Sequence, residues 1–281
     1  MLIVFNEERA GTEPLPLQSS NTLSAEIKVE ERDAVAHVRL ERPEKRNALT
    51  SGMLERLAEI FAGVAARRDL RAVVLSGAGA DFCAGTDIAE LERLDEESAR
   101  RKAERGQEVF DAIELCGTPV VAAIAGAASG GGCELALACH LRVAATNARF
   151  SLPEARLGVV PAYGGTARLA RAVGSGRALA AMLACDEINA DEALRLGLVN
   201  RVVEPARLID EAEALARAII EAAAPLAVRA CLEAVTRGAR LPFDDALKLE
   251  AELFSRLFST EDVREGTRAF LEKRKPSFRG Q

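Results

Sequence analysis

The 281 residues are enough for one large domain with a substantial buried core, alone or with an appendage. Apolar residues make up 49% of the chain and charged residues 28%, a balance typical of folded soluble proteins that excludes disorder as the main state. With 37 basic and 43 acidic residues the net charge is −6, and aromatic residues account for only 4%. This composition argues against nucleic-acid binding, which needs a basic face and stacking residues, although it leaves room for a local basic pocket.

Cysteine and histidine usage indicates a reducing compartment and no bound metal. The six cysteines form no Cys-x-x-Cys pair, and His37 and His140 are the only histidines, so a zinc site is not expected. The N-terminus turns acidic after a short apolar run, unlike a secretory signal, and the longest apolar stretch, 119–145, is interrupted by glycines and charged residues, as in a buried core. We therefore expect a soluble cytoplasmic protein with free thiols and no membrane association. His37 is expected within a strand, and His140 at a helix end, where a protonated imidazole would suit the helix dipole.

Apolar periodicity predicts alternating strands and helices after an irregular N-terminal extension, residues 1–24. Residues 25–31 and 34–40 alternate as the strands of a hairpin that turns at Arg32 and Asp33. Thr50 or Ser51 then caps a helix with apolar positions up to Val64. The elements expected after it are a strand at 71–76, a long charged helix at 88–115, a strand at 119–125, a helix at 131–140 and a strand at 141–145. This order predicts an α/β fold.

The pattern changes at about Asp191. One more strand is expected at 198–203, followed by helices broken at Pro205, Pro225, Pro242 and Pro276. Residues 225–281 carry more apolar positions than a short helical tail can bury alone, which predicts a closed oligomer. The chain is therefore divided into the extension, a core at 25–224 and a helical oligomerisation region at 225–281.

Three segments carry candidate chemistry. In residues 81–88 a glycine precedes a helix start, where free backbone N–H groups favour negative charge, although any ordinary helix start has the same pattern. In residues 125–139 three glycines precede Glu134, the only acid among some thirty apolar and small residues. Burial would raise the pKa of Glu134 toward neutrality and suit it to proton transfer, while simple capping of the helix fits equally well. In residues 151–166 Glu154 follows a strand and a proline, ahead of a Pro-x-x-Gly-Gly-Thr loop. Spacing alone does not place the two glutamates together.

The chain resembles the crotonase family, the enoyl-CoA hydratases and isomerases, from about Glu26 to Phe278. The shared motifs occur in the family's order and are Arg-Pro-x-x-x-Asn-Ala-Leu at 42–49, Phe-x-Ala-Gly-x-Asp-Ile at 82–88, Gly-Gly-Gly-Cys-Glu-Leu at 130–135, Pro-Glu with its Gly-Gly-Thr loop, and Gly-x-x-Ala-Phe-Leu-Glu-Lys-Arg-Lys-Pro at 266–276. The resemblance implies a crotonase-type spiral of ββα units with a helical C-terminal trimerisation region, usually assembled as a dimer of trimers.

The resemblance also implies a role for each segment. The thioester carbonyl of an acyl-CoA would be held by the backbone N–H groups of Thr86 and Gly131, an oxyanion hole. Glu134 would activate a water for attack on Cβ of a 2-enoyl-CoA, and Glu154 would deliver a proton to Cα. The residues implied for substrate binding are Ala84, Asp87 and Ile88 near the thioester, Tyr163 near the acyl group, and Lys45 or Arg46, Phe270 and Lys273 at the nucleotide end. No cofactor is implied, because coenzyme A is part of the substrate.

Two positions depart from the family pattern. Tyr163, the single tyrosine, and Ala162 replace a smaller pair, which would narrow the acyl pocket or present a hydroxyl to the substrate. His140 stands where an aspartate is common, so any polar network that this aspartate supports is in doubt. The expected activity is hydration of a 2-enoyl-CoA. The alternatives are an enoyl-CoA isomerase or another lyase or hydrolase of the family, for which one glutamate suffices, and a non-catalytic acyl-CoA-binding scaffold, which the intact Glu134 and Glu154 disfavour.

Overall fold

The hairpin at the start of the core is confirmed. In the computed structural model, which describes residues 26–281, β1 (Ile27–Arg32) pairs antiparallel with β2 (Val35–Leu40). Asp33 and Ala34 turn the chain between these strands with positive φ angles of 47° and 65°. The predicted N-terminal extension, residues 1–24, lies outside the described residues.

The hairpin opens a six-stranded sheet with the order β1-β2-β3-β4-β6-β9, in which every pair after β1 and β2 is parallel. Its remaining strands are β3 (Ala72–Gly77), β4 (Val120–Ile124), β6 (Leu141–Ala145) and β9 (Arg201–Val203). A smaller sheet has the order β5-β7-β8 and consists of β5 (Ala127–Ser129), β7 (Arg149–Ser151) and β8 (Ile188–Asn189). The strands of the smaller sheet are two or three residues long, too short for an alternating pattern to reveal them in the sequence.

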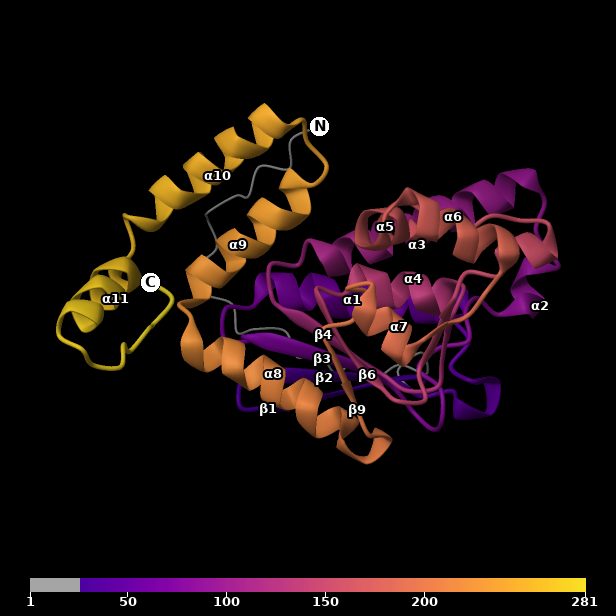
Figure 1. The fold of residues 1–281 in the computed structure, drawn as a ribbon, viewed down its shortest axis with the longest axis horizontal. Coiled ribbons are helices and arrows are strands. Elements are labelled where there is room, and N and C mark those ends of the chain that lie inside the picture. Colours follow the sequence, from indigo (N-terminus) through magenta and orange to yellow (C-terminus); the bar gives the residue numbers. More distant parts are fainter. Residues whose placement is uncertain (1–25) are drawn as a thin grey trace.

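The main sheet is buried on both faces. On β3, Ala72 and Val74 belong to the apolar layer that includes Leu208 and Ala212 of α8 (Leu208–Ala222). Val73 of the same strand belongs to the opposite layer, which includes the apolar face of α1 (Ser51–Ala66). Figure 1 shows α8 on one side of the sheet and α1 and α4 on the other. Since alternate side chains of a strand point to opposite faces, a strand covered on both sides is apolar along most of its length, as β4 is throughout and β3 is from Ala72 to Leu75.

The helices largely follow the expected order. Besides α1 and α8, the described residues form α2 (Ile88–Leu91), α3 (Glu96–Glu114), α4 (Gly131–Ala138), α5 (Gly165–Val173), α6 (Ser175–Ala184), α7 (Ala190–Arg195), α9 (Pro225–Gly238), α10 (Phe243–Leu257) and α11 (Glu261–Leu271). Short 3-10 turns occupy Pro43–Lys45, Glu154–Leu157 and Pro205–Arg207. The cap at Thr50 is confirmed, because its hydroxyl accepts the Met53 N–H at 3.1 Å.

Two predicted elements are wrong in extent. The single helix at 88–115 is two helices, because Asp95 and Ser98 form a reciprocal capping box that starts a new helix at Glu96. The strand at 198–203 is confined to Arg201–Val203. The backbone N–H groups of Leu198 and Val199 instead donate to the carbonyl of Ala193 and close the end of α7.

His140 follows the end of a helix, as expected, but it is not the protonated imidazole that would suit the helix dipole. The helix ends at Ala138, and burial lowers the pKa of His140 to about 4. Its Nδ1 accepts the backbone N–H of Val120 at 3.0 Å, and Nε2 lies 3.0 Å from the carbonyl of Glu114. A neutral imidazole that accepts at Nδ1 and donates at Nε2 satisfies both contacts, so His140 connects α3 to the start of β4. His37 lies within β2, as expected.

The C-terminal helices α9, α10 and α11, with residues 225–281, form what we call the C-terminal arm. Figure 1 shows α10 and α11 extending away from the sheet. Large apolar side chains on the arm are open to solvent in one chain, including Phe254 at 64%, Phe270 at 84% and Leu271 at 80% exposure. An apolar surface of this kind is typical of a region that packs against another chain.

The cysteines are free thiols, as expected. Five of them are buried, and Cys231 on α9 is exposed. Burial raises the pKa of the Cys83 thiol to about 12 and that of Cys116 to about 11, so both remain neutral at physiological pH.

Candidate active site

The first two candidate segments leave the same edge of the main sheet. The segment 81–88 follows β3 and the segment 125–131 follows β4, and the carboxyl ends of adjacent parallel strands meet at one edge. Backbone hydrogen bonds join the two segments: Cys83 N donates to Ala127 O at 2.9 Å, and Ser129 N donates to Cys83 O at 3.0 Å. The sequence segments that looked independent are therefore one structural unit.

At the end of this unit, Thr86 and Gly131 lie against each other. A side-chain carbon placed on Gly131 would be 3.4 Å from Thr86 N and 3.1 Å from Thr86 Oγ1. Gly131 is the first residue of α4, where the helix leaves its N–H groups without intrahelical acceptors. Among residues 26–281, the N–H groups of Thr86 and Gly131 have no hydrogen-bond acceptor. Two adjacent, unused donors at a helix N-terminus are suited to a carbonyl oxygen that gains negative charge.

Glu134 lies one turn into α4 with only 2% of its surface exposed. Its Oε1 accepts the backbone N–H of Tyr163 at 2.8 Å and that of Gly165 at 2.7 Å. Burial is the largest effect on this carboxyl and raises its pKa to about 7, with a further increase from the charge of Glu154, while the two backbone donors oppose the rise. The start of α4 has no side-chain cap, so Glu134 is not a helix cap, and burial favours its protonated form up to near neutral pH.

The pairing of β5 with β7 brings Glu154 to the same place. Gly130 N donates to Ser151 O at 2.9 Å, and Glu154 begins the 3-10 turn that follows β7. A side-chain carbon on Gly130 would lie 2.9 Å from Glu154 Oε1. Burial raises the pKa of Glu154, and its Oε2 is buried without a hydrogen-bond partner among the described residues.

The two carboxyl groups therefore flank the glycines at the start of α4. Burial disfavours both groups as anions, and the charge of Glu154 further raises the cost of ionising Glu134, so this pair retains a proton to higher pH than exposed carboxyl groups do. One carboxylate and one carboxylic acid next to two unused N–H donors can remove a proton from one atom and give a proton to another. Such an arrangement is suited to general acid–base chemistry beside a polarised carbonyl group.

Tyr163 forms a wall of this site. Its ring occupies the space that a side chain on Gly106 would take, since a carbon placed on that glycine would be 2.1 Å from the ring. The ring contacts Phe110 edge to face at a centroid distance of 5.4 Å, and its hydroxyl lies 3.4 Å from Thr86 Oγ1. The side chain is 3% exposed, and burial raises its pKa to about 12. Tyr163 thus links α3 to the Thr86–Gly131 donor pair and remains a neutral phenol.

The residues expected near the thioester surround the Thr86 loop. Ala84 N donates to Arg46 O at 2.9 Å, which ties the loop to the 3-10 turn that carries Lys45. The carboxylate of Asp87 pairs with Arg42 at 3.2 Å and accepts the Ala89 N–H at 3.1 Å, so this side chain fixes the start of α2. Ile88 is 58% exposed.

The cationic and aromatic residues expected at the nucleotide end are not all gathered in one chain. Arg46 is held by Asp81 at 2.7 Å, whereas the exposed Lys45 makes no ion pair with residues 26–281. Phe270 and Lys273 lie on and just after α11, and Figure 1 shows this helix at the opposite end of the molecule from α2. A single chain therefore does not bring them to the site.

Sequence reasoning missed two supporting residues. Asn47 is fully buried, and its side-chain amide donates to the carbonyls of Ala78 and Asp81, both at 2.8 Å, which holds the chain between β3 and Thr86. The signal was the Arg-Pro-x-x-x-Asn motif, to which no role had been given. The second is Gly106, which makes room for the Tyr163 ring. Its signal in the sequence was a glycine inside a long helix, because such a glycine weakens the helix.

The described residues contain no cluster of His, Cys, Asp and Glu side chains suited to holding a metal ion. Within residues 26–281, the helices are too short or too polar to cross a membrane.

Comparisons with known proteins agree with this α/β fold and its glycine-bounded site. Residues 30–281 match the family described as enoyl-CoA hydratase/isomerase. A short-chain-enoyl-CoA hydratase from Clostridium acetobutylicum is 43% identical over 88% of this chain and 95% of its own. A crotonyl-CoA hydratase from Syntrophomonas wolfei is 42% identical over 90% of this chain and 97% of its own.

The fold is also that of a solved enoyl-CoA hydratase. The crystal structure of the enzyme from Bacillus anthracis superposes with a TM-score of 0.86 at 36% sequence identity, covering 91% of this chain and all of the other. The chain belongs to the enoyl-CoA hydratase/isomerase family and has the crotonase fold.

Proposed function

We propose that the protein is an enoyl-CoA hydratase, which adds water across the 2,3 double bond of a 2-enoyl-CoA thioester. The observation that carries this proposal is the pair of carboxyl groups, Glu134 and Glu154, beside the unused N–H groups of Thr86 and Gly131. Relatives named as short-chain-enoyl-CoA and crotonyl-CoA hydratases support the same activity.

In the proposed reaction the thioester oxygen accepts hydrogen bonds from Thr86 N and Gly131 N, which makes Cβ electrophilic. Glu134, as the carboxylate, removes a proton from a water whose oxygen bonds to Cβ, and the electrons of the double bond move to the thioester oxygen as an enolate. Glu154, as the acid, gives its proton to Cα while the carbonyl reforms. The product is a 3-hydroxyacyl-CoA. Glu134 then releases the proton that it gained, and Glu154 takes up a proton, which restores the starting state.

The raised pKa of both groups supports proton exchange near neutral pH, while the assignment of the base to Glu134 and of the acid to Glu154 follows from the resemblance to the family. Two carboxylates that both ionise fully could supply a base but no acid at neutral pH. Because burial raises both pKa values, we propose that the pair shares one proton near neutral pH, so that a base and an acid coexist before each turnover. The addition is neither an oxidation nor a reduction, and as written it balances with water as the only co-substrate.

Substrate binding is proposed for the residues around the donor pair. Ala84, Asp87 and Ile88 would border the thioester and pantetheine through the loop that they form, and Lys45 would meet the nucleotide phosphates. Tyr163 would border the acyl group, since its hydroxyl reaches Thr86 and its ring closes the space toward α3.

The C-terminal arm is proposed to be the oligomerisation region of a cytoplasmic homotrimer or homohexamer. Its exposed phenylalanines, 243, 254, 258 and 270, would be buried against other copies. Phe270 and Lys273 would reach a nucleotide end only from a second copy. Light scattering at micromolar concentration should give three or six times the mass of one chain, and the mass of a single chain would overturn the assembly.

The activity is tested by the loss of enoyl absorbance when the protein is mixed with crotonyl-CoA and with longer 2-enoyl-CoAs. Hydration of at least one of them is expected. A protein that leaves every 2-enoyl-CoA unchanged but converts a 3-enoyl-CoA to the conjugated isomer would be an isomerase. A protein that binds acyl-CoA and converts neither would be a scaffold.

A further inference from the structure

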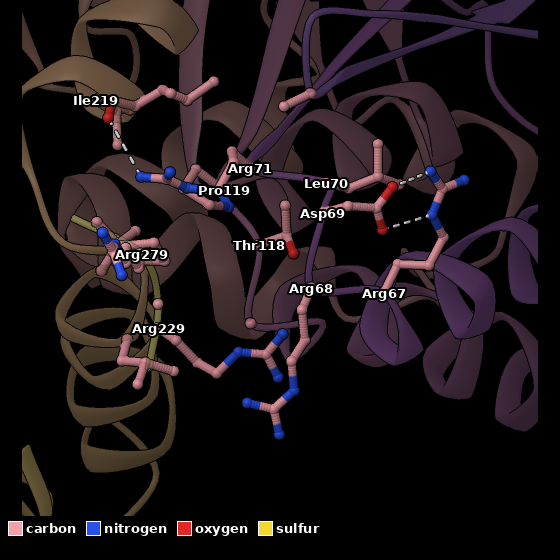
Figure 2. Close-up of a pocket in the computed structure, with 17 residues that line it drawn as sticks. Arg67, Arg68, Asp69, Leu70, Arg71, Thr118, Pro119, Ile219, Arg229 and Arg279 are labelled. Carbon is pink, nitrogen blue, oxygen red and sulfur yellow. Dashed lines mark hydrogen bonds and ion pairs between the residues drawn. The ribbon is translucent and has the colours of Figure 1, made fainter. Parts of the chain in front are cut away.

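A cavity of about 290 Å³ lies at the edge of the main sheet opposite the catalytic loops. It is bordered by Arg71 and Pro119, the residues just before β3 and β4, whereas the segments of the proposed active site leave the far ends of the same strands. Pro225 at the start of α9 and Gly280 near the C-terminus complete the border, so the cavity lies between the core and the C-terminal arm (Figure 2). It is therefore separate from the site proposed for acyl-CoA.

The lining of this cavity is strongly basic in a chain whose net charge is negative. Five arginines border it, while Asp69 is the one acidic residue of its lining. The arginines of the lining are Arg67, Arg68, Arg71, Arg229 and Arg279.

Two of the five arginines have structural partners. Arg67 pairs with Glu31 at 2.7 Å and with Asp69 at 2.5 Å, so the acid of the cavity is already used. Arg71 donates to the carbonyls of Ile220 and Ala223 at 3.2 and 3.1 Å, which fixes the end of α8 without neutralising the guanidinium.

The other three, Arg68, Arg229 and Arg279, form no ion pair with any carboxylate of residues 26–281. They come from three separate parts of the chain: the end of α1, the middle of α9 and the C-terminal segment. Figure 2 shows the side chains of Arg68 and Arg229 directed toward the same region, with Thr118 above them.

The backbone makes room for this arrangement. Arg229 is packed against Gly117, where a side-chain carbon would be 3.1 Å from the guanidinium carbon. Thr118, the next residue, is 3% exposed and also borders the cavity. The buried carboxylate of Asp262 accepts the backbone N–H groups of Arg279 and Gly280 at the cavity border, whereas Arg68 and Arg229 have no such counterion among residues 26–281. Two cations directed toward one region repel each other, so an anion between them would relieve an unfavourable charge distribution.

We propose that this cavity is a binding site for a small phosphorylated anion. Guanidinium groups match phosphate oxygens in paired hydrogen bonds, and two unpaired arginines directed toward one region of a cavity can bind a group with several anionic oxygens. The volume, at the lower end of the range for small-molecule sites, suits a phosphate or diphosphate group more than a complete nucleotide. The bound anion joins Arg68 of the core to Arg229 of the arm and so fixes the base of the arm against the core.

The site is tested by calorimetric titration of the full-length protein with inorganic phosphate, pyrophosphate and succinate at constant ionic strength. Saturable binding of pyrophosphate or phosphate, tighter than that of succinate, is expected. Arg68→Gln and Arg229→Gln should each weaken it roughly tenfold to a hundredfold, because each removes a charge-assisted contact. Arg100→Gln is the matched control, since Arg100 is exposed on α3 outside the cavity and loses the same charge.

The proposal is overturned by the absence of saturable binding, by equal affinity in the cavity variants and the control, or by tighter binding of succinate. If acetyl-CoA displaces pyrophosphate, and the cavity variants bind pyrophosphate as tightly as the unsubstituted protein does, the pyrophosphate lies in the acyl-CoA site instead. If no anion binds and Arg229→Gln changes the mass of the oligomer, the cavity residues form a contact between copies of the chain and not an anion site. Hydration of crotonyl-CoA by the same protein is measured in parallel. If the unsubstituted protein does not hydrate crotonyl-CoA, the proposed activity is refuted, but the titration still tests the anion site.

Discussion

Replacing Glu134 by glutamine is expected to remove activity and to stabilise the fold at the same time. The glutamine keeps an oxygen for the N–H groups of Tyr163 and Gly165, which now hold Oε1 at 2.8 and 2.7 Å. It cannot accept a proton from water, so kcat for hydration should fall by roughly 10²–10⁴-fold. It also carries no charge, and therefore escapes the cost of ionising a group that is 2% exposed.

The pKa of Glu134 fixes the size and the sign of the stability change. Below pH 4.5 the carboxyl is protonated in the folded and the unfolded chain, so its ionisation costs folding nothing. Between pH 4.5 and about 7 the unfolded chain ionises while the folded chain keeps the proton, and stability falls as the pH rises through this window. The difference between these two pKa values corresponds to a loss of folding stability on the order of 3 kcal/mol, which is complete above pH 7.

Urea denaturation of the two proteins at pH 5 and at pH 8 measures this difference. At pH 8 Glu134→Gln should be more stable than the unsubstituted protein by on the order of 3 kcal/mol, and at pH 5 most of the advantage should be gone. Glu104→Gln, an exposed substitution on α3, should show no such dependence on pH. A gain of the same size at both pH values, or a loss at pH 8, would refute the argument that buried charge at Glu134 opposes folding.

Three further substitutions test the rest of the site. Glu154→Gln should lower kcat by roughly 10²–10⁴-fold with KM for crotonyl-CoA nearly unchanged, and an undiminished kcat would remove Glu154 from proton transfer. Gly131→Val should cost roughly 10²–10³-fold in kcat because its side chain would crowd Thr86, whereas Thr86→Ala keeps its N–H and should retain most activity. The reverse ranking would assign the polarising role to the Thr86 hydroxyl. Gly106→Ala should destabilise the fold by about 1–3 kcal/mol, because its methyl would lie 2.1 Å from the Tyr163 ring, and urea denaturation measures the loss. Adding Tyr163→Ala should recover much of this loss, and a double variant as unstable as Gly106→Ala would mean that the ring is not what the methyl meets.

The order of elements could be predicted because each long strand and helix carries its own periodic signal. The residues of α1 and β3 show their burial pattern locally, without reference to their partners. The break between α2 and α3 was predictable in principle from Asp95 and Ser98, but the charged residues on both sides continued a helical pattern across it. The strands β5, β7 and β8 are defined by their pairing rather than by their own residues, which is why periodicity did not reveal them.

The candidate site could be predicted only residue by residue. The apolar neighbours of Glu134 in the chain indicated its burial and its raised pKa, and the structure agrees. Its proximity to Glu154 depends on the pairing of Ser129 with Ser151 across 22 residues, and no local signal encodes that pairing. The resemblance to a family supplied the connection that the residues alone did not.

The hydrogen bonds that hold Glu134 have an evolutionary consequence. Both donors are backbone N–H groups, of Tyr163 and Gly165, and a backbone donor survives every substitution except proline. Substitutions at position 163 other than proline therefore keep a hydrogen bond that orients the neighbouring carboxyl, and they change its pKa only through its burial. Mutations at this position can reshape the wall of the proposed acyl pocket while both backbone hydrogen bonds to Glu134 are inherited intact.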